Sequence, residues 1–290
     1  MSAVIQHEIS RGQMAFALIA VLASILFVRL GFWQLDRHAE KREAAALREA
    51  RLAEPPVSLA TLLEQEDMGP AGEGIEWRRI ALRGRWDPAG EVLIRNRVLN
   101  GRPGVHVVTP LVLDPEGRTS TAGASEVEIS AELLVLRGWM AAPDAMTPGP
   151  IAPPARAGRN DEPLIGAIRT SRDGAGGPML LSGEGAEQRP SFAAIDVAAI
   201  ERSAEDSASY LPVFVQLLRE KERELMGSPM EAGTLIRVPL PEPGSGPHLA
   251  YAVQWFFFAA ISLIGTVAYI FQPRRRSPAR GPSTEGPSRS

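Results

Sequence analysis

The chain has 290 residues, a nearly balanced charge (net −3) and no cysteine. The balanced charge, with no basic stripe in the central region, argues against nucleic-acid binding. The lack of cysteine means that disulfides cannot indicate the compartment.

The first long apolar stretch runs from Met14 to Leu35 and predicts a membrane-spanning helix. A hydrocarbon core about 30 Å thick needs about 20 apolar residues of helix, and Arg29 is the one charge in this stretch. A cleaved signal peptide is the alternative, with Arg11 before the apolar core and Val21-Leu22-Ala23 as the cleavage site. The apolar run continues well past Ala23, which favours an uncleaved anchor.

The region after this span predicts a helix and then a β-rich domain. Residues 36–53 are rich in Ala, Glu, Arg and Leu and predict a helix that continues straight out of the span. Short β-forming stretches separated by turn signals predict a β-rich α+β domain, either a barrel or a strongly curved sheet. Strands are expected over 77–86, 91–97, 105–113, 127–140, 163–170 and 212–218, a short helix over 196–202 and a loop over 141–162. Pro110 predicts that its strand lies at an edge or contains a bulge.

The second apolar stretch, Leu249–Phe271, predicts a second span. Arginines 274–276 and 280 favour a cytoplasmic C-terminus, whereas the basic residues over 37–51 favour the opposite orientation. We favour both termini inside. We expect a cytoplasmic N-terminal tail over residues 1–13, a transmembrane helix over 14–35 and an extracytoplasmic β-rich domain over 36–247. A second transmembrane helix follows over 248–271, and a disordered basic cytoplasmic tail over 272–290.

His248, Tyr251 and Trp255 stand at the head of the second span. Offsets of three and seven residues place them on one helix face, within about 60° of each other. A neutral imidazole can ligate haem iron axially, and the two aromatic rings can stack on a porphyrin or hydrogen-bond its periphery. The alternative is an aromatic belt at the membrane interface, which binds no ligand.

Arg29 and Trp33 lie late in the first span, in the same leaflet as His248 and Trp255 if the domain is outside. Arg29 can snorkel to the lipid headgroups. The alternative hypothesis is that Arg29 or Arg37 pairs with a haem propionate.

The remaining chemistry-bearing residues suggest no catalytic site. His7, His38 and His106 have no metal-ligand spacing, and the scattered methionines do not suggest copper delivery. Gly174–Gly177 lacks the Lys-Ser/Thr of a phosphate-binding loop, and no nucleophile elbow occurs. We therefore do not expect an enzyme.

Several sequence blocks, in order from about residue 30 to 260, resemble the surfeit locus protein 1 family of cytochrome c oxidase assembly factors. These blocks are Leu30–Arg37 with Glu40-Lys41, Trp77–Ile80 with Gly84, Trp86 and Asn96-Arg97, Pro103–Leu111, Arg137-Gly138-Trp139, and His248–Phe256. The two-span layout also resembles that family.

The resemblance implies a non-catalytic role in maturing subunit I of the haem-copper oxidase in the bacterial cell membrane. It implies transient haem a binding between the outer ends of the two spans, with His248 as the iron ligand and Tyr251, Trp255, Arg29 and Trp33 as further contacts. The implied partners are oxidase subunit I, haem a synthase and the lipid bilayer. The alternative is a membrane scaffold that stabilises an assembly intermediate and never binds haem.

Overall fold

The computed structural model describes residues 10–114, 132–145, 156–157, 163–171, 177–181, 189–204, 209–218, 235–242, 244 and 246–272. The chain forms two compact units, Met1–Ala44 with Gly244–Ser290, and Ala45–Pro243. The helices are α1 (Arg11–Ala53), α2 (Leu59–Gln65), η1 (Glu73–Ile75), α4 (Ala142–Ala145), α5 (Val197–Ser203) and α6 (His248–Ile270). The strands are β1 (Arg79–Leu82), β2 (Gly84–Trp86), β3 (Val92–Leu99), β4 (Arg102–Leu113), β5 (Glu132–Ala141), β6 (Arg156–Ala157), β7 (Leu164–Thr170), β8 (Met179–Leu181), β9 (Arg189–Phe192) and β10 (Tyr210–Leu217).

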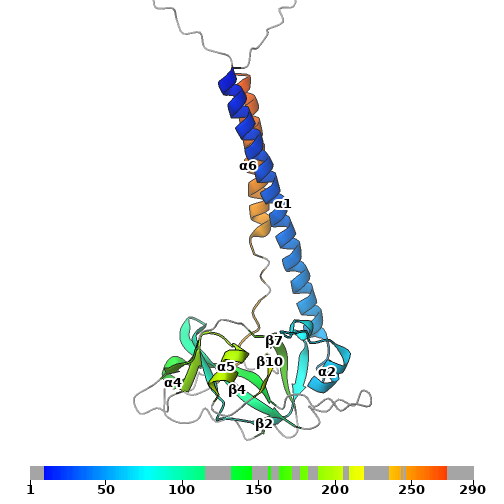
Figure 1. Ribbon diagram of the computed structural model, residues 1–290, viewed down its shortest axis with the longest axis vertical. Coiled ribbons are helices and arrows are strands. Elements are labelled where there is room, and N and C mark those ends of the chain that lie inside the picture. Colours follow the sequence, from blue (N-terminus) through cyan, green and yellow to red (C-terminus); the bar gives the residue numbers. More distant parts are fainter. Residues whose placement is uncertain are drawn as a thin grey trace, which may run out of the picture. The chain divides into compact units, whose positions relative to one another are not determined.

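The first unit, hereafter the membrane unit, contains α6 and most of α1, which lie side by side (Figure 1). Both helices are long and apolar enough to cross a membrane, judged by length and composition. The predicted span and the predicted helix over 36–53 form one continuous helix that ends at Ala53, just before Pro55-Pro56. This outcome confirms the prediction that the helix continues straight out of the apolar stretch.

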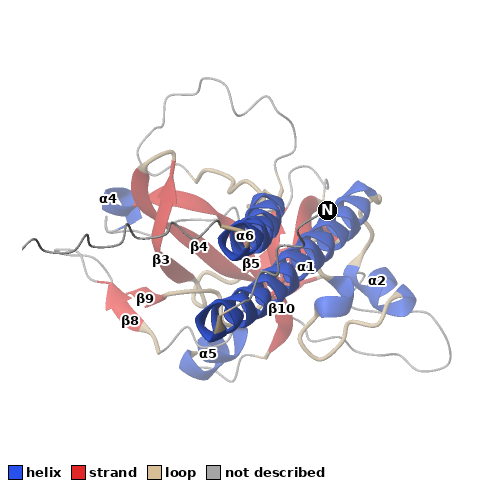
Figure 2. Cartoon of the chain, turned by 90° about the horizontal axis from the view of Figure 1, so that it is seen from above, coloured by secondary structure: helices blue, strands red, loops and turns tan. Residues whose placement is uncertain are grey.

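The second unit, hereafter the barrel unit, is built on a ten-stranded mixed sheet. Eight strands follow the order β1-β7-β10-β5-β4-β3-β9-β8, and β2 lies off this path, paired with β4 and β6. Its central strands lie side by side in Figure 2. Strand β1 pairs with β7, and β2, which follows after Arg83, pairs with β4. The strands therefore close a ring that runs β1-β7-β10-β5-β4-β2, while β3, β9 and β8 extend outward from β4. The predicted barrel or strongly curved sheet is confirmed in this form.

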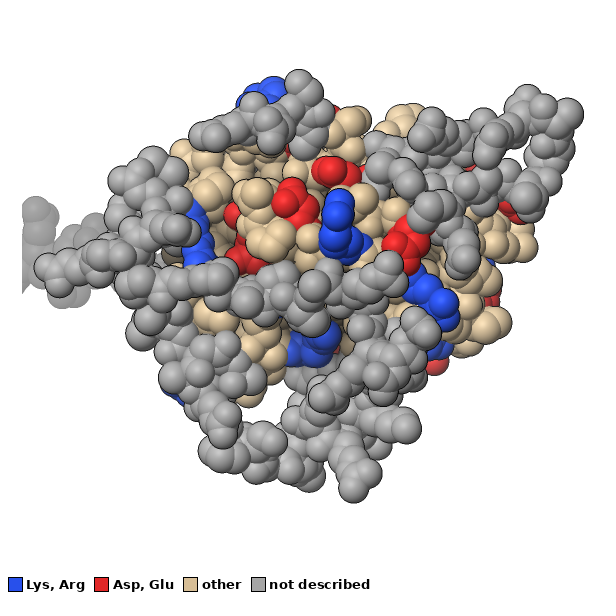
Figure 3. Space-filling model, turned by 90° about the horizontal axis from the view of Figure 1, so that it is seen from below, with Lys and Arg blue, Asp and Glu red and all other residues tan. Residues whose placement is uncertain are grey.

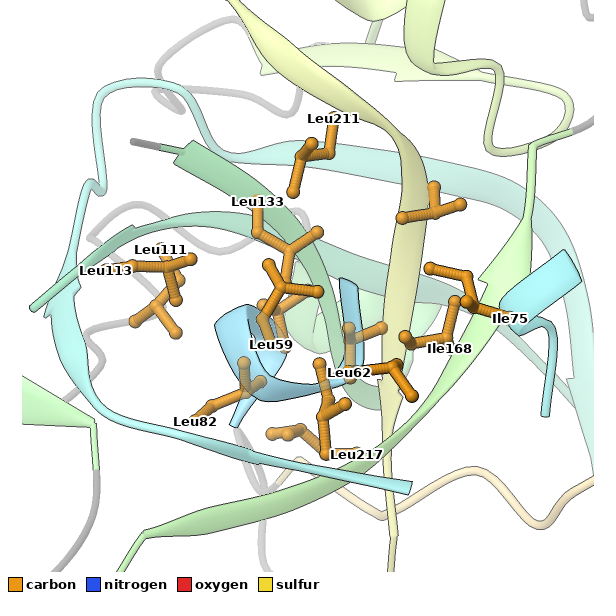
Figure 4. Close-up of a cluster of buried hydrophobic side chains, with 14 of the residues drawn as sticks. Leu59, Leu62, Ile75, Leu82, Leu111, Leu113, Leu133, Ile168, Leu211 and Leu217 are labelled. Atoms are coloured by element: carbon orange, nitrogen blue, oxygen red, sulfur yellow. The ribbon is translucent and has the colours of Figure 1, made fainter. Parts of the chain in front are cut away.

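Alternating side chains of the ring strands fill the barrel interior. Leu82, Leu133 and Val215 are among the buried members of this core, and Leu59 and Leu62 of α2 belong to the same cluster (Figure 4). Helix α2 begins where the Ser58 side chain accepts a hydrogen bond from the Thr61 backbone N–H, which caps its first turn. Burying whole leucine side chains contributes roughly 1.5–3 kcal/mol each, so α2 is part of the barrel's stability.

A second apolar layer covers the outside of the sheet. Helix α5 begins at the Asp196 cap, close to the start of the short helix expected over 196–202. Its Val197 and Ile200 belong to a buried cluster with Leu134 and Phe214. Basic and acidic side chains are interspersed on the face of the barrel unit shown in Figure 3.

Pro110 does not mark an edge strand, so that part of the prediction is wrong. Strand β4 has β5 on one side, and on its other side it pairs with β3 up to Val108 and with β2 from Leu111. Pro110 falls where the partner changes, and its carbonyl accepts a hydrogen bond from Asp87 N–H. Proline lacks an N–H, so it is tolerated at this break in the ladder.

The bulge that the proline also suggested lies nearby. The β4–β5 register shifts between Val107 and Val108, which pair with Gly138 and Leu136, so that Arg137 is the extra residue. Two further predictions need correction. The expected strand over 77–86 is split at Arg83, because β1 before it pairs with β7 and β2 after it pairs with β4. The expected loop over 141–162 contains α4 and β6. The expected disordered tail and Gly174–Gly176 lie outside the described residues.

Candidate functional site

Helices α1 and α6 of the membrane unit pack antiparallel along a seam of regularly spaced residues. On α1 the buried positions are Ala20, Ser24 and Gly31, and the half-buried positions 13, 17, 27 and 34 extend this row at alternating steps of three and four. On α6 the buried positions are Ala252, Ala259 and Thr266, seven residues apart. This spacing is typical of a coiled-coil seam.

Small residues let the two helices approach closely. The Ser24 hydroxyl donates to Ala20 O at 2.8 Å, and Ser262 on α6 donates to the same carbonyl at 3.1 Å. A Cβ on Gly31 would lie 2.6 Å from the Phe256 ring, so Phe256 packs directly on the Gly31 backbone. Small residues and hydroxyl hydrogen bonds are the usual means of helix association in lipid, where apolar packing alone gives little driving force.

His248 lies at one end of this seam, in the first turn of α6. Its Nδ1 is 2.9 Å from Oε1 of Gln34 on α1. Because an amide oxygen can only accept, Nδ1 donates in this contact, and in the neutral ring the lone pair is then on Nε2. A Cβ at Gly246, whose φ is +62°, would lie 3.0 Å from His248 Nε2, so glycine keeps that edge of the ring uncrowded.

The structure separates the other predicted contact residues. Trp255 lies on the seam and stacks on Phe27 with 5.7 Å between ring centroids. Tyr251 is 48% exposed and Trp33 is 51% exposed. His248 and Trp255 thus share the face toward α1, while Tyr251 lies at its margin.

Arg29 faces away from the seam. It is two residues from Phe27 and two from Gly31, which puts it roughly 160–200° around the helix from both. Its side chain is exposed, so α6 and His248 lie on the opposite side of α1. One turn after Trp33, Arg37 lies 6.0 Å from the Trp33 ring centroid and bonds Glu40 at 2.7 Å.

Gln34, Gly31 and Phe27 are the site residues that sequence reasoning missed. The three-and-four spacing of small and apolar residues on α1 was visible in the sequence. However, the Gln34 contact joins residues 214 apart in the chain and depends on the relative register of two helices.

The sequence profile of the SURF1 family matches residues 21–260. This chain belongs to the SURF1 family. The proteins of this family are membrane-associated and are known generally as cytochrome oxidase assembly factors. The resemblance drawn from the sequence blocks is therefore confirmed.

Similar SURF1-like proteins come from two Mycobacterium species and from Monosiga brevicollis. Uncharacterised SURF1-like proteins of Mycobacterium bovis and Mycobacterium tuberculosis are 28% identical over 281 residues, which covers 95% of this chain and 91% of each relative. A SURF1-like protein of Monosiga brevicollis is 27% identical over 282 residues, 93% of each chain. The match therefore extends over both helices and the barrel.

The Arg137-Gly138-Trp139 block of this SURF1 protein forms a buried junction in β5. The Arg137 guanidinium bonds Glu91 at 3.0 Å and lies 5.5 Å from the Trp86 ring centroid. Burial raises the pKa of Glu91, opposed by the hydrogen bond from Thr109 and the charge of Arg137. Burial lowers the pKa of Arg137, and the charge of Glu91 opposes this. Sequence reasoning did not single out Glu91, because nothing in its neighbourhood marks a buried acid.

The Arg137-Gly138-Trp139 block also binds the segment over 235–240, which precedes α6 in the chain. Trp139 exchanges two backbone hydrogen bonds with Ile236, at 2.7 and 2.8 Å, and Arg237 donates to Arg137 O. A Cβ on Gly138 would lie 2.7 Å from Ile236 O. The expectation that this glycine permits close backbone approach is confirmed.

A second junction is centred on Trp77 of the SURF1 block over 77–80. Its ring centroid lies 4.1 Å from the Arg48 guanidinium carbon and 3.9 Å from that of Arg169. Arg51 donates to Glu76 O at 2.8 Å. These contacts fasten the last turns of α1 to the barrel.

Among the described residues, no three His, Asp or Glu side chains form a metal-binding group. His106 lies in β4, where burial, with a smaller effect from Arg97, lowers its pKa to about 4. A neutral, half-buried histidine of this kind suits a packing role. His248 is therefore the histidine that this SURF1 protein offers at the α1–α6 seam of its membrane unit.

Proposed function

We propose that this protein helps to insert haem a into subunit I of cytochrome c oxidase, by holding haem a transiently at the His248 end of the helix seam. Membership of the SURF1 family supports the oxidase-assembly part. The observation that carries the haem part is the His248–Gln34 hydrogen bond, which leaves Nε2 as the available lone pair.

The residues at this end fit an axial haem ligand. Metal-binding histidines usually donate their other N–H to an oxygen, which fixes ring orientation and tautomer, and Gln34 provides that oxygen. Gly246 places no side chain against the Nε2 edge. When bound, haem iron supplies a coordination position for an imidazole nitrogen. His248 is the residue that would hold it, and Tyr251 and Trp255 would flank it.

The closely packed seam limits where a porphyrin can lie. Gly31 is in contact with Phe256, and Ala20 accepts from Ser262, so the ring does not fit between the helices at those levels. We infer contact at the His248 end, beside the helices rather than deep between them. Arg29 and Trp33, on the far side of α1, are not part of this proposed contact.

In the same proposal the barrel unit is extracytoplasmic and both termini are cytoplasmic, in the bacterial cell membrane. Arginines 274–276 support this orientation. The barrel unit would contact subunit I of the oxidase or haem a synthase, and the two helices would lie in the lipid bilayer.

A scaffold that binds no haem is the second candidate. The observation in its favour is the stacking of Trp255 on Phe27, which already gives one predicted haem contact a partner within the chain. In that case His248 and Gln34 would simply fasten the helix ends together.

The test is an optical and pyridine-haemochrome spectrum of detergent-purified full-length protein, co-expressed with haem a biosynthesis enzymes. We expect a haem a signal in the wild type and its loss in His248→Ala. In Gln34→Leu the signal should weaken roughly tenfold, as expected when an outer-shell partner is removed. His38→Ala, a histidine change on α1 one turn beyond Gln34, is the control and should keep the signal.

Protein yield decides between the two candidates. A signal lost from His248→Ala at equal yield supports the haem carrier. A wild type that is folded but free of haem, in membranes that contain haem a, would favour the scaffold.

A further inference from the structure

Arg29 is a charge within an apolar span, and it faces outward. It is the one charged residue of Met14–Leu35. It lies opposite the seam and is exposed. A charge facing hydrocarbon is costly, and such residues usually pair or line a polar path.

Neither apolar span offers Arg29 a counter-charge. Neither Met14–Leu35 nor His248–Phe271 contains an Asp or Glu. Among the described residues, Arg29 makes no ion pair or hydrogen bond with another side chain. The nearest acid along α1 is Asp36, seven residues on, or roughly 10 Å along the axis.

Snorkelling is poorly suited to this position. The seam contacts Phe27–Trp255 and Gln34–His248 place Arg29 at the level of residues 253–254, roughly 8 Å below the first residue of α6. Side chains of an α-helix tilt toward its N-terminus. For Arg29 that direction leads away from the nearer end of the span, so reaching a headgroup requires the side chain to turn back on itself.

The next positions on this face are already engaged. Trp33 follows Arg29 by one turn and is half exposed, and the Arg37 guanidinium lies over its ring. Arg37 also has Glu40 as its acid partner. Among the described residues, Arg29 therefore has no acid partner. It lies with Trp33 on one exposed face of α1, hereafter the Arg29–Trp33 face.

We propose that the Arg29–Trp33 face docks a membrane helix of a partner protein that carries a carboxylate at the depth of Arg29. Charge complementarity favours such a helix, because its carboxylate would neutralise Arg29 within the span. A second copy of this chain has no acid at that depth to offer. The proposal depends on membrane insertion of α1 and does not depend on haem binding.

The test uses full-length protein in phosphatidylcholine nanodiscs and a synthetic Leu/Ala membrane helix with one Glu at the depth of Arg29. A donor dye on a Gln272→Cys variant and an acceptor on the peptide report association by energy transfer. We expect the Glu peptide to bind roughly fivefold more tightly than a matched Gln peptide. Arg29→Leu should abolish that preference, and Gln254→Leu, a polar change at the same depth on α6, should keep it.

A register experiment separates a partner helix from a lipid headgroup. In the double variant Arg29→Leu, Ile25→Arg the charge moves one turn deeper, and the preferred Glu position of the peptide should move by one turn with it. Equal binding of Glu and Gln peptides to wild type would overturn the proposal. So would a preference that disappears when phosphatidylglycerol is added, since that result identifies a lipid phosphate as the occupant.

Discussion

Trp77 has a backbone φ of +70°, a conformation that bulky residues rarely adopt. Two guanidiniums about 4 Å from one ring centroid cannot share a face, so Arg48 and Arg169 lie on opposite faces of the indole. Arg48 belongs to α1 and Arg169 to β7, so this stack joins the end of the helix to the barrel. Strain at Trp77 is offset by the contacts that its position allows.

We predict a coupling free energy of about 1 kcal/mol between Arg48 and Trp77 in a double-mutant cycle. The cycle consists of Arg48→Ala, Trp77→Leu and the double variant, each followed by urea unfolding of the full chain in detergent. Exposed Arg83 gives the control cycle and should show no coupling to Trp77. Additive losses for Arg48 and Trp77 would mean that the stack contributes nothing beyond burial.

His106 gives the barrel a pH dependence of known sign. Its pKa is about 4 in the folded chain, below the ordinary value of 6.5, because burial disfavours the charged ring. The unfolded chain therefore binds a proton first as the pH falls. The stability contribution is complete above pH 6.5 and is lost as the pH falls toward 4.

Between pH 7 and pH 5 we expect His106 to account for about 2 kcal/mol of lost unfolding free energy. The measurement is the free energy of urea unfolding of wild type and His106→Gln at both pH values. The variant should lose about 2 kcal/mol less than wild type across this interval. The raised pKa of Glu91 changes the stability with pH in the opposite direction. Because Glu91 is present in both proteins, its contribution cancels in this difference. Parallel losses in both proteins would contradict the prediction.

At the scale of elements, β5 connects the buried ion pair to the segment that leads to α6. The Arg137 bulge turns its side chain to Glu91, Gly138 lies close to the Ile236 backbone, and Trp139 pairs with Ile236. Gln216 of β10 adds hydrogen bonds to Val238 O at 2.9 Å and Pro239 O at 3.3 Å. The segment over 235–240 is thus held by two neighbouring strands.

Gly138→Ala should release this segment. The added Cβ would lie 2.7 Å from a backbone oxygen, so the pair of hydrogen bonds between Trp139 and Ile236 must lengthen or break. Losing two such bonds costs about 2 kcal/mol. Hydrogen exchange at the Trp139 and Ile236 amides should accelerate about 30-fold for that cost.

Gly177→Ala is the matched control, since a Cβ added at Gly177 would meet nothing within 4 Å. It should leave the Trp139 and Ile236 amides as protected as in wild type. Unchanged exchange in Gly138→Ala as well would show that the backbone accommodates the methyl group by a small shift.

The elements that the sequence predicted are those with long or repeated patterns. The two helices and the longer strands follow from apolar length and β-forming runs. Helix α2 has seven residues, too few to show a helical period, although the Ser58 cap was a usable signal. The interior placement of Pro110 depends on a change of partner strand, which is a tertiary event with no local signature.

The candidate site also divides into residues that a local sequence pattern reveals and residues whose role depends on tertiary contacts. His248 is visible in the sequence because a titratable residue stands at the head of a span. Gln34 and Gly246 are not, because their roles exist only once α1 and α6 are in register and the turn before α6 has formed. Arg29 was visible as a charge, but its outward direction required the seam to be known.

At the scale of the whole molecule, α1 and α6 are both long and apolar enough to cross a membrane, and two crossings would place both termini on the same side. The basic residues near the spans give opposing signals for which side that is: Arg37, Lys41 and Arg42 follow the first span, and arginines 274–276 follow the second. Long domains are translocated largely regardless of charge, so the tail arginines are the better indicator. We therefore expect the barrel unit outside and the tail inside.

Because the chain has no cysteine, a single introduced thiol reports the topology without background. Ala89 in the barrel unit and Gln272 after α6 are both exposed, so each accepts Cys at little cost. In intact spheroplasts, a membrane-impermeant maleimide should label Ala89→Cys, and should label Gln272→Cys only after permeabilisation. The reversed pattern would place the barrel unit in the cytoplasm, and then the basic residues after the first span, rather than the tail arginines, set the orientation. Labelling of both sites in intact spheroplasts would mean that α6 does not cross the membrane, and the paired-span arrangement of α1 and α6 would have to be abandoned.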